Sequence, residues 1–251
     1  MILAPSDKAL LARTRTKGAL TEAYWRTEYI GSRGNGVVRD EPQAYLVEMS
    51  PNQAVAPHFH AVDQFQVFVA GAGRFGPNHS VSPVCLHYAD HHTGYGPIVA
   101  GPEGFSYFTL RARTDSGVVF IDAPGARDKL QPSRKRHAVA AGITLGTAPV
   151  LRSRASVGVE DLLPDLDGAD GLCARLFRIG PGVTALAPDA SASGGQFHVV
   201  LNGQLEHGGD RYPAWSLIHV GAGDARLPLT GGAEGAEVLM VQFPQRPSSS
   251  A

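Results

Sequence analysis

The sequence predicts an all-β protein built from two copies of one β unit. Thirty Gly and 18 Pro among 251 residues are too many helix breakers for a helical chain and are typical of short strands joined by turns. Hydrophobic residues at 43% and charged residues at 18% describe a globular chain with ample core. Segments of the two halves also resemble each other at a nearly constant spacing, which indicates an internal repeat.

The expected elements start with the one helix signal in the chain, over residues 6–28, where Ser6-Asp7 is a candidate cap. Four β-prone runs bounded by Gly, Pro or Asn then predict strands at residues 45–49, 64–69, 84–88 and 106–110. Residues 124–149 lose this rhythm and collect Pro, Gly and charge, which predicts a connection between domains with a strand near Ile143 left open.

The repeat sets the predicted domain organisation. Residues 46–51 resemble residues 176–181 at an offset of 130, and the offset reaches 132 where Gln64 matches Gln196, Gly71 matches Gly203, and Leu86-His87 matches Ile218-His219. One-residue insertions in loops explain the drift. We therefore expect an arm with a short helix (1–40), an N-terminal barrel (41–123), a linker (124–150), a degenerate C-terminal barrel (151–246) and a tail (247–251).

The string Pro57-His58-Phe59-His60, followed by Gln64 and then Gly71, is the most informative in the chain. Residues two apart on a strand face the same side, so His58 and His60 can both offer an imidazole nitrogen to one metal ion. A tight turn then lets Gln64 join them. The alternatives are two buried, hydrogen-bonded histidines, and Asp63 as the ligand in place of Gln64.

This pattern resembles the first motif of the cupins, in which His-any-His, three or four residues, Glu, six residues and Gly close one end of a double-stranded β-helix, or jelly-roll, barrel. The resemblance implies a bicupin with its metal in the N-terminal barrel. In this sequence Gln64 replaces the Glu, which leaves a metal without a compensating negative charge and more weakly held. The family has a third His ligand, and the candidates for it here are His92 first and His87 second. His91 is the neighbour of His92 and lies on the other face.

The barrel mouth and the second copy complete the candidate residues. Gln66 and Tyr95 are expected to line a substrate pocket, whereas ordinary strand packing is favoured for Tyr107. The second copy has Ala and Ser where the imidazoles would be. Its Gln196 and His198 should face the barrel interior by strand alternation, and we expect this copy to be a structural partner without metal.

The resemblance implies a metal-dependent oxygenase acting on a small anionic compound of the hydroxy-acid, catecholic or diketone-like class. One divalent metal per chain is expected, Fe(II) first, with Zn, Mn or Ni as alternatives. A metal-dependent isomerase or lyase and a non-catalytic ligand-binding module are the competing functions.

Charge and hydropathy narrow the partners and the location. A net charge of −1 argues against nucleic acid, and no run approaches the roughly 20 apolar residues of a membrane span. Two isolated cysteines, Cys85 and Cys173, agree with a reducing compartment, so a cytoplasmic protein is expected. Whether the chain forms a homodimer is left open.

Overall fold

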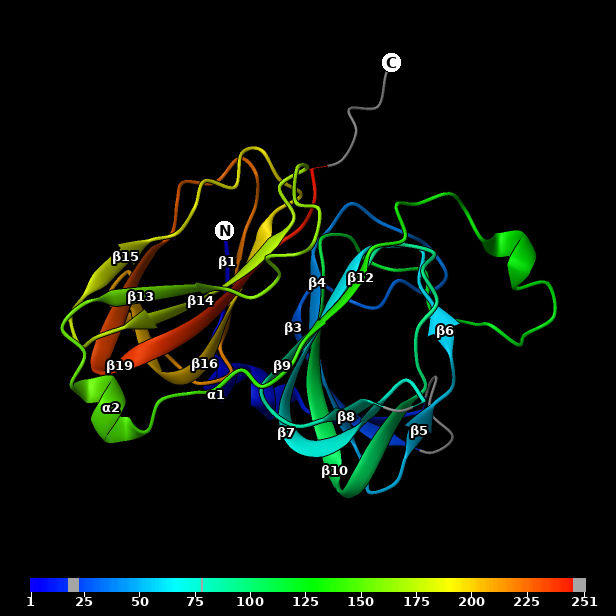
Figure 1. The fold of residues 1–251 in the computed structure, drawn as a ribbon, viewed down its shortest axis with the longest axis horizontal. Coiled ribbons are helices and arrows are strands. Elements are labelled where there is room, and N and C mark those ends of the chain that lie inside the picture. The colour runs from blue at the N-terminus through cyan, green and yellow to red at the C-terminus, as the bar shows by residue number, and fades with distance from the viewer. Residues whose placement is uncertain (18–22, 78, 246–251) are drawn as a thin grey trace. The chain divides into compact units, whose positions relative to one another are not determined.

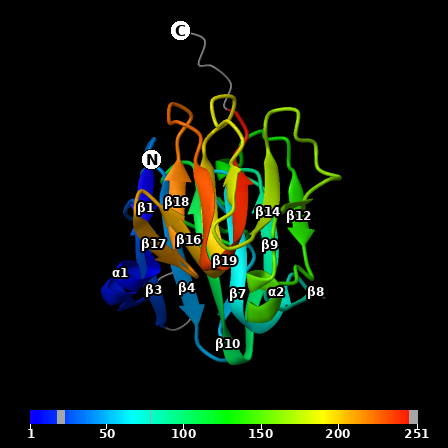
Figure 2. The same ribbon diagram turned by 90° about the vertical axis from the view of Figure 1, so that its left-hand side faces the viewer.

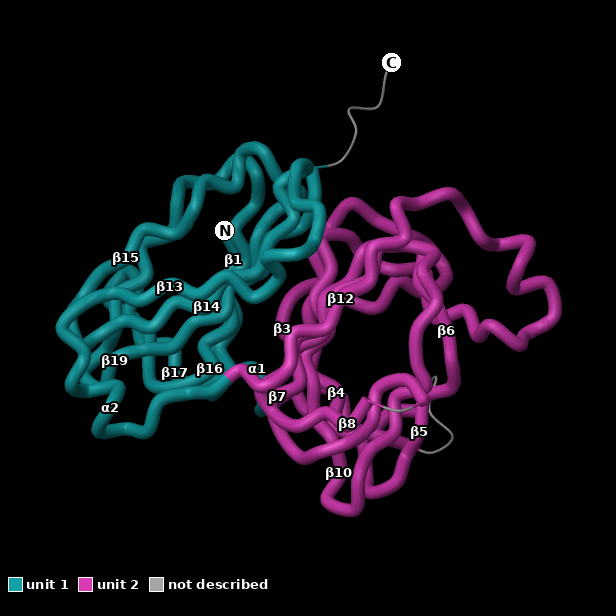
Figure 3. Tube along the Cα trace, in the orientation of Figure 1, with its two compact units in different colours: residues 1–11, 144–251 teal, residues 12–143 magenta. Residues whose placement is uncertain are grey.

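The computed structural model describes residues 1–17, 23–77 and 79–245, and about half of these residues lie in strands (Figure 1). Contacts divide the chain into two units (Figure 3): residues 12–143, called here the N-terminal barrel, and residues 1–11 with 144–251, called the C-terminal barrel. Each contains one large antiparallel sheet. The prediction of an all-β chain with two jelly-roll barrels is confirmed. These divisions differ from the predicted boundaries, because the first 11 residues join the C-terminal barrel and most of the expected linker joins the N-terminal one.

The N-terminal barrel holds a nine-stranded sheet in the order β12-β9-β7-β10-β4-β3-β2, with β5 paired to β10 and β8 to β7, and a separate pair of β6 and β11. The strands are β2 (Thr14–Thr16), β3 (Tyr24–Ile30), β4 (Gln43–Met49), β5 (Ala54–Val55), β6 (His58–Phe59), β7 (Gln64–Phe75), β8 (His79–Val81), β9 (Cys85–Ala89), β10 (Ile98–Arg111), β11 (Val119–Phe120) and β12 (His137–Ala140), with a 3₁₀ turn at Arg127–Lys129.

The C-terminal barrel holds an eight-stranded sheet in the order β1-β18-β16-β19-β14-β13, with β15 paired to β19 and β17 to β16 (Figure 2). Its elements are β1 (Ile2–Ala4), α1 (Ser6–Ala9), α2 (Ala148–Arg152), β13 (Val157–Asp161), β14 (Cys173–Ile179), β15 (Thr184–Leu186), β16 (Gln196–His207), β17 (Asp210–Pro213), β18 (Leu217–Val220) and β19 (Pro228–Gln242), and a 3₁₀ turn at Leu10–Ala12 follows α1. No helix among the described residues has the length and apolar character that crossing a membrane requires.

The two barrels share a backbone feature that explains one pair of the repeat. Gly71 in β7 has a φ of +72°, and a Cβ there would lie 2.2 Å from the carbonyl oxygen of Gly104. Gly203 in β16 has a φ of +68°, and its Cβ would lie 2.2 Å from the carbonyl oxygen of Gly235. Left-handed backbone and a close approach both require glycine, so the same local geometry is selected in each barrel.

The helix expected over residues 6–28 is wrong for most of its length. Only α1 and the turn after it are helical, residues 14–16 and 24–30 are strands, and residues 18–22 lie outside the described part of the chain. The segment Tyr24–Ile30 is rich in aromatic and β-branched residues, and its pairing with β4 outweighs a weak helical pattern.

The expected match of His87 with His219 is wrong by one residue. His87 pairs with Gln66 in the N-terminal barrel. The repeat counterpart of Gln66 is His198, but His219 pairs with Phe197, one position earlier. A slip of one residue turns a side chain to the other face of a strand. His219 accordingly packs its ring on Phe197, with 4.8 Å between centroids. In the N-terminal barrel, Tyr88 packs on Phe65 in the same way, at 4.7 Å.

Candidate functional site

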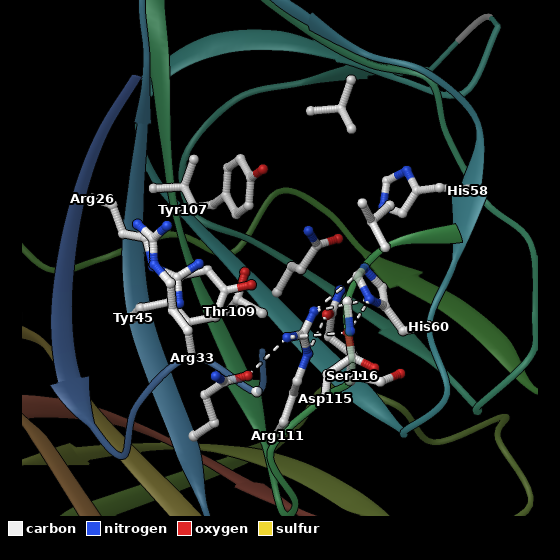
Figure 4. Close-up of a pocket in the computed structure, with 18 of the residues that line it drawn as sticks. Arg26, Arg33, Tyr45, His58, His60, Tyr107, Thr109, Arg111, Asp115 and Ser116 are labelled. Atoms are coloured by element: carbon white, nitrogen blue, oxygen red, sulfur yellow. Dashed lines mark hydrogen bonds and ion pairs between the residues drawn. The ribbon is translucent and has the colours of Figure 1, made fainter. Parts of the chain in front are cut away.

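The N-terminal barrel encloses a cavity of about 260 Å³ (Figure 4). Its lining alternates along four strands: Tyr24 and Arg26 from β3, Gln43, Tyr45 and Val47 from β4, Gln64 and Gln66 from β7, and Tyr107, Thr109 and Arg111 from β10. Loop residues complete it, among them His60, Arg33 and Asp115. Because strand side chains alternate in direction, every second residue of each strand reaches the interior.

The predicted histidine pair meets at this cavity. The rings of His58 and His60 lie 5.2 Å apart between centroids and nearly perpendicular, at 85°. The Nδ1 of His58 lies 2.7 Å from the carbonyl oxygen of Ala56, and the Nδ1 of His60 lies 2.6 Å from a carboxylate oxygen of Asp115. Both partners are acceptors, so each Nδ1 carries the proton, and each neutral imidazole keeps its lone pair on Nε2.

Burial sets the charge state of this group. It lowers the pKa of His58 to about 3, with a further contribution from His60. Burial and the neighbouring Arg111 also lower the pKa of His60. Burial alone would raise the pKa of Asp115, but Arg111 and the hydrogen bond from His60 hold it at about 2. Near neutral pH both histidines are therefore neutral and Asp115 is ionised.

Arg111, the last residue of β10, lies at the centre of the polar contacts (Figure 4). Its Nε donates to Oε1 of Gln64 at 2.8 Å, and its Nη1 donates to Oε1 of Gln43 at 2.8 Å. Its Nη2 lies against the His60 ring, 3.1 Å from Nδ1 and 3.3 Å from Nε2, and Nη1 lies 3.6 Å from the carboxylate of Asp115. The guanidinium is buried and fully surrounded by acceptors, the arrangement that a buried cation needs.

Gln64, Gln66 and Tyr95 lie near the histidine pair. The amide nitrogen of Gln64 donates to the Tyr95 hydroxyl at 2.6 Å, and the amide oxygen of Gln64 accepts a hydrogen bond from the Arg111 guanidinium. The oxygen of Gln66 accepts from Nδ1 of His87 at 2.9 Å. The Tyr95 ring packs 4.5 Å from that of His58 and supports it from behind, outside the set of cavity-lining residues. Tyr107, for which packing was favoured, lines the cavity.

His92 is placed away from the other predicted ligands. Its ring packs 5.7 Å from Phe59, whose side chain points to the other face of β6 from its two histidine neighbours. Its backbone N–H donates to the carbonyl oxygen of His60 at 2.7 Å. The Nδ1 of His91 is hydrogen-bonded to the carboxylate of Asp63 at 2.7 Å. The structure thus brings together His58, His60 and Gln64 of the predicted set and leaves the third imidazole out.

The residues around the histidine pair do not fit a divalent metal. Within the described residues no group of three or more His, Cys, Asp or Glu side chains could hold one. The oxygen of Gln64, which would be the third ligand, already accepts from Arg111, and the same guanidinium lies against His60. A metal placed there would meet a permanent positive charge without any free carboxylate to offset it.

Sequence reasoning missed the charged residues of the cavity. Arg26, Arg33 and Arg111 line it, and among its described lining residues Asp115 is the one acidic side chain. Glu28, outside the lining, bonds Arg26 at 2.6 Å and lies 3.5 Å from Arg33, so three arginines face two carboxylates. Strand alternation was a usable signal, because it places Arg111 on the same face of β10 as Tyr107 and Thr109.

Comparison with known proteins supports the fold but not a particular function. No protein-family model matches the chain, and no curated protein does. Among solved structures, a "putative dioxygenase" from Nostoc punctiforme matches with a TM-score of 0.64 at 12% identity, over 99% of this chain and 84% of that one. An oxalate decarboxylase of Lactobacillus farciminis, solved as a formate complex, matches with a TM-score of 0.57 at 12% identity, over 98% and 86%.

A third solved structure is the oxalate decarboxylase of Bacillus subtilis, which contains Mn(II) centres. It matches with a TM-score of 0.55 at 11% identity, over 96% of this chain and 77% of that one. At such identities the likeness shows the architecture alone, because one fold supports many chemistries. The chain therefore shares the β-barrel architecture of these solved structures, and its own side chains must decide its chemistry.

Proposed function

We propose that the N-terminal barrel binds a small organic anion of the carboxylate class and promotes a proton-transfer reaction on it. The observation that carries this proposal is the set of three arginines around a cavity of about 260 Å³. That size lies near the lower end of small-molecule pockets, which span about 300 to 1,000 Å³, so the ligand is small.

The arginines are held in place for anion recognition. The guanidinium of Arg26 lies 3.4 Å from the centroid of the Tyr45 ring and bonds Glu28, which fixes its plane. Arg33 lies at the same side of the cavity and donates to the Thr16 hydroxyl at 2.9 Å (Figure 4). Planar guanidinium groups match the two oxygens of a carboxylate, and a partly buried site strengthens this attraction.

His58 supports the proton-transfer part of the proposal. It lines the cavity, is neutral, and has its free lone pair on Nε2 because Nδ1 bonds a backbone carbonyl oxygen. A bound anion favours the imidazolium form, so the pKa of His58 rises when the ligand arrives and the ring becomes a better base. The resulting reaction class is an isomerisation or elimination that begins by removing a proton next to the carboxylate.

The oxygenase expected from the cupin resemblance receives less support from the geometry. Its Fe(II) would need the Gln64 oxygen and the space beside His60, and Arg111 uses both. The anionic substrate expected with it, a hydroxy-acid or related compound, fits the arginines equally well without a metal. One structural neighbour was solved as a formate complex, so a protein of similar fold binds a small carboxylate.

Calorimetric titration with hydroxy-acids and catecholic acids, each beside its uncharged amide or ester, tests the proposal, and diketones without a carboxylate serve as a further uncharged comparison. A charge-assisted contact is worth about 1.5 to 3 kcal/mol, so the neutral analogues should bind roughly 10- to 150-fold more weakly. Arg33→Gln should weaken anion binding, whereas Arg152→Gln, a half-exposed arginine of the C-terminal barrel, should leave it unchanged. Equal affinity for acids and amides would reject the proposal.

Proton transfer needs its own measurement. In D₂O, a bound carboxylate with an adjacent C–H should exchange that hydrogen for deuterium, and the NMR signal should persist in a His58→Ala sample. If the parent protein binds the anion tightly but does not exchange this hydrogen, the protein binds the ligand without catalysis, and the catalytic part of the proposal is wrong.

A further inference from the structure

The Arg111 guanidinium occupies the space between polar groups of the barrel that could surround a cation. The carbonyl oxygens of Gln64 and Gln43 each accept from it at 2.8 Å, and its Nη2 lies against the His60 ring, 3.1 Å from Nδ1 and 3.3 Å from Nε2. One imidazole ring and two neutral oxygens therefore surround a single cation. Imidazole nitrogens and carbonyl oxygens are also the groups that bind divalent metals, so the same donors would serve either kind of cation.

The C-terminal barrel provides an internal comparison. There Gln242 is the last residue of β19 and pairs with Gln196, the first residue of β16. In the N-terminal barrel Arg111 ends β10, and β10 runs against β7, which begins at Gln64. Gln242 accepts from Gln196 at 2.7 Å, so a neutral amide stands at the position of the guanidinium. The cation is therefore present in the barrel that has the histidine pair and absent from the one that lacks it.

We propose that Arg111 is a built-in replacement for the metal ion of the barrel, so that the protein uses a fixed guanidinium where its fold otherwise accommodates a divalent cation. In both histidines Nδ1 is bonded to an acceptor, which leaves the lone pair on Nε2 as in a metal-ligating imidazole, and in His60 the guanidinium lies against that nitrogen. Removing the guanidinium should therefore expose a site that binds metal. The inference shares Arg111 with the proposed function, but metal binding tests it separately from anion binding.

The test is titration of tag-free, chelator-treated protein with Co²⁺ and Zn²⁺ alone, followed by calorimetry and by the visible absorption of histidine-bound Co²⁺. The parent protein should show no such absorption. Arg111→Ala should bind one Co²⁺ per chain, and Arg111→His, which adds an imidazole, should bind it more tightly. Adding His58→Ala to either variant should abolish the absorption.

A matched control is Arg26→Ala, which removes another cavity arginine that bonds Glu28 and not the histidines. It should bind no Co²⁺, because the lone pairs around His60 remain occupied. Circular dichroism and thermal unfolding report whether each variant folds. The parent protein can also refute the inference. If it binds Co²⁺ or Zn²⁺ stoichiometrically and His58→Ala loses this binding, the inference is wrong. Folded Arg111 variants that bind no metal would overturn it as well.

Discussion

Replacing Asp115 by Asn should destabilise the N-terminal barrel strongly without changing the size of the side chain. Asp115 is 1% exposed and accepts hydrogen bonds from Nδ1 of His60 at 2.6 Å, from the Ala61 N–H at 3.2 Å and from the Gly117 N–H at 3.0 Å. Its charge also faces the Arg111 guanidinium at 3.6 Å. Asparagine keeps one acceptor oxygen, but it directs an amide N–H₂ at donors and leaves the guanidinium without its buried counter-charge.

The size of the effect follows from that burial. Removing one partner of a buried ion pair costs about 3 to 5 kcal/mol, and here solvent screening is too weak to reduce it. With a urea dependence of about 1 to 3 kcal/mol per molar, the unfolding midpoint should fall by at least about 1 M. The fluorescence of Trp25, measured in a Trp215→Phe background, follows the N-terminal barrel alone, because the chain has two tryptophans, one in each unit.

The control is Asp128→Asn, an exposed carboxylate of the same barrel, which should change stability by no more than about 0.5 kcal/mol. If Asp115→Asn destabilises no more than this control does, the Arg111 cluster is not held by the Asp115 charge, and our reading of the site's electrostatics is wrong.

Three further predictions concern stability. Burial lowers the pKa values of His58, His60, His87 and His198, so the unfolded chain binds more protons below about pH 6.5. Stability should therefore be level above pH 6.5 and fall below it, by up to about 1.4 kcal/mol per pH unit for each histidine; equal urea midpoints at pH 7 and pH 5 would contradict this. Gly71→Ala should cost more than Gly36→Ala in urea unfolding, because both have positive φ but only Gly71 has a backbone oxygen at 2.2 Å from the new Cβ. Phe68→Ala removes a fully buried ring stacked 4.7 Å from Phe105 and should cost about 3 to 5 kcal/mol, and a loss below about 1 kcal/mol would show that the core re-packs.

Much of the fold could be predicted from local sequence. The four expected strands match β4, β7, β9 and β10, because β-prone runs with glycine and proline at their ends carry their own signal. The short spacing of His58 and His60 likewise predicted their meeting. Alignment of the halves failed on β9 and β18, because residue identity favoured His87 with His219 whereas backbone pairing set a register one residue away.

The remaining site residues could not be found in this way, since they come from distant parts of the chain. Asp115 lies 55 positions from its partner His60, and Arg111 lies 47 positions from Gln64. A search guided by metal-binding residue types selects histidines and passes over arginine. It therefore favoured His92, whose φ of +54° belongs to a turn beside Phe59. Strand alternation was the available signal for Arg111, and no comparable pattern points to Asp115.

The first strand of the chain has a consequence for the timing of folding. β1 pairs with β18, and Ser6 donates hydrogen bonds from its backbone N–H and its hydroxyl to Ser216 and Ala214, residues about 210 positions later. At a synthesis rate of about 5 to 20 residues per second, the amino terminus waits roughly 10 to 40 s on the ribosome before its partner strand exists. The N-terminal barrel, which is continuous in sequence, is complete well before then. We therefore expect co-translational protease protection to reach residues 12–143 first and residues 2–4 only near the end of synthesis.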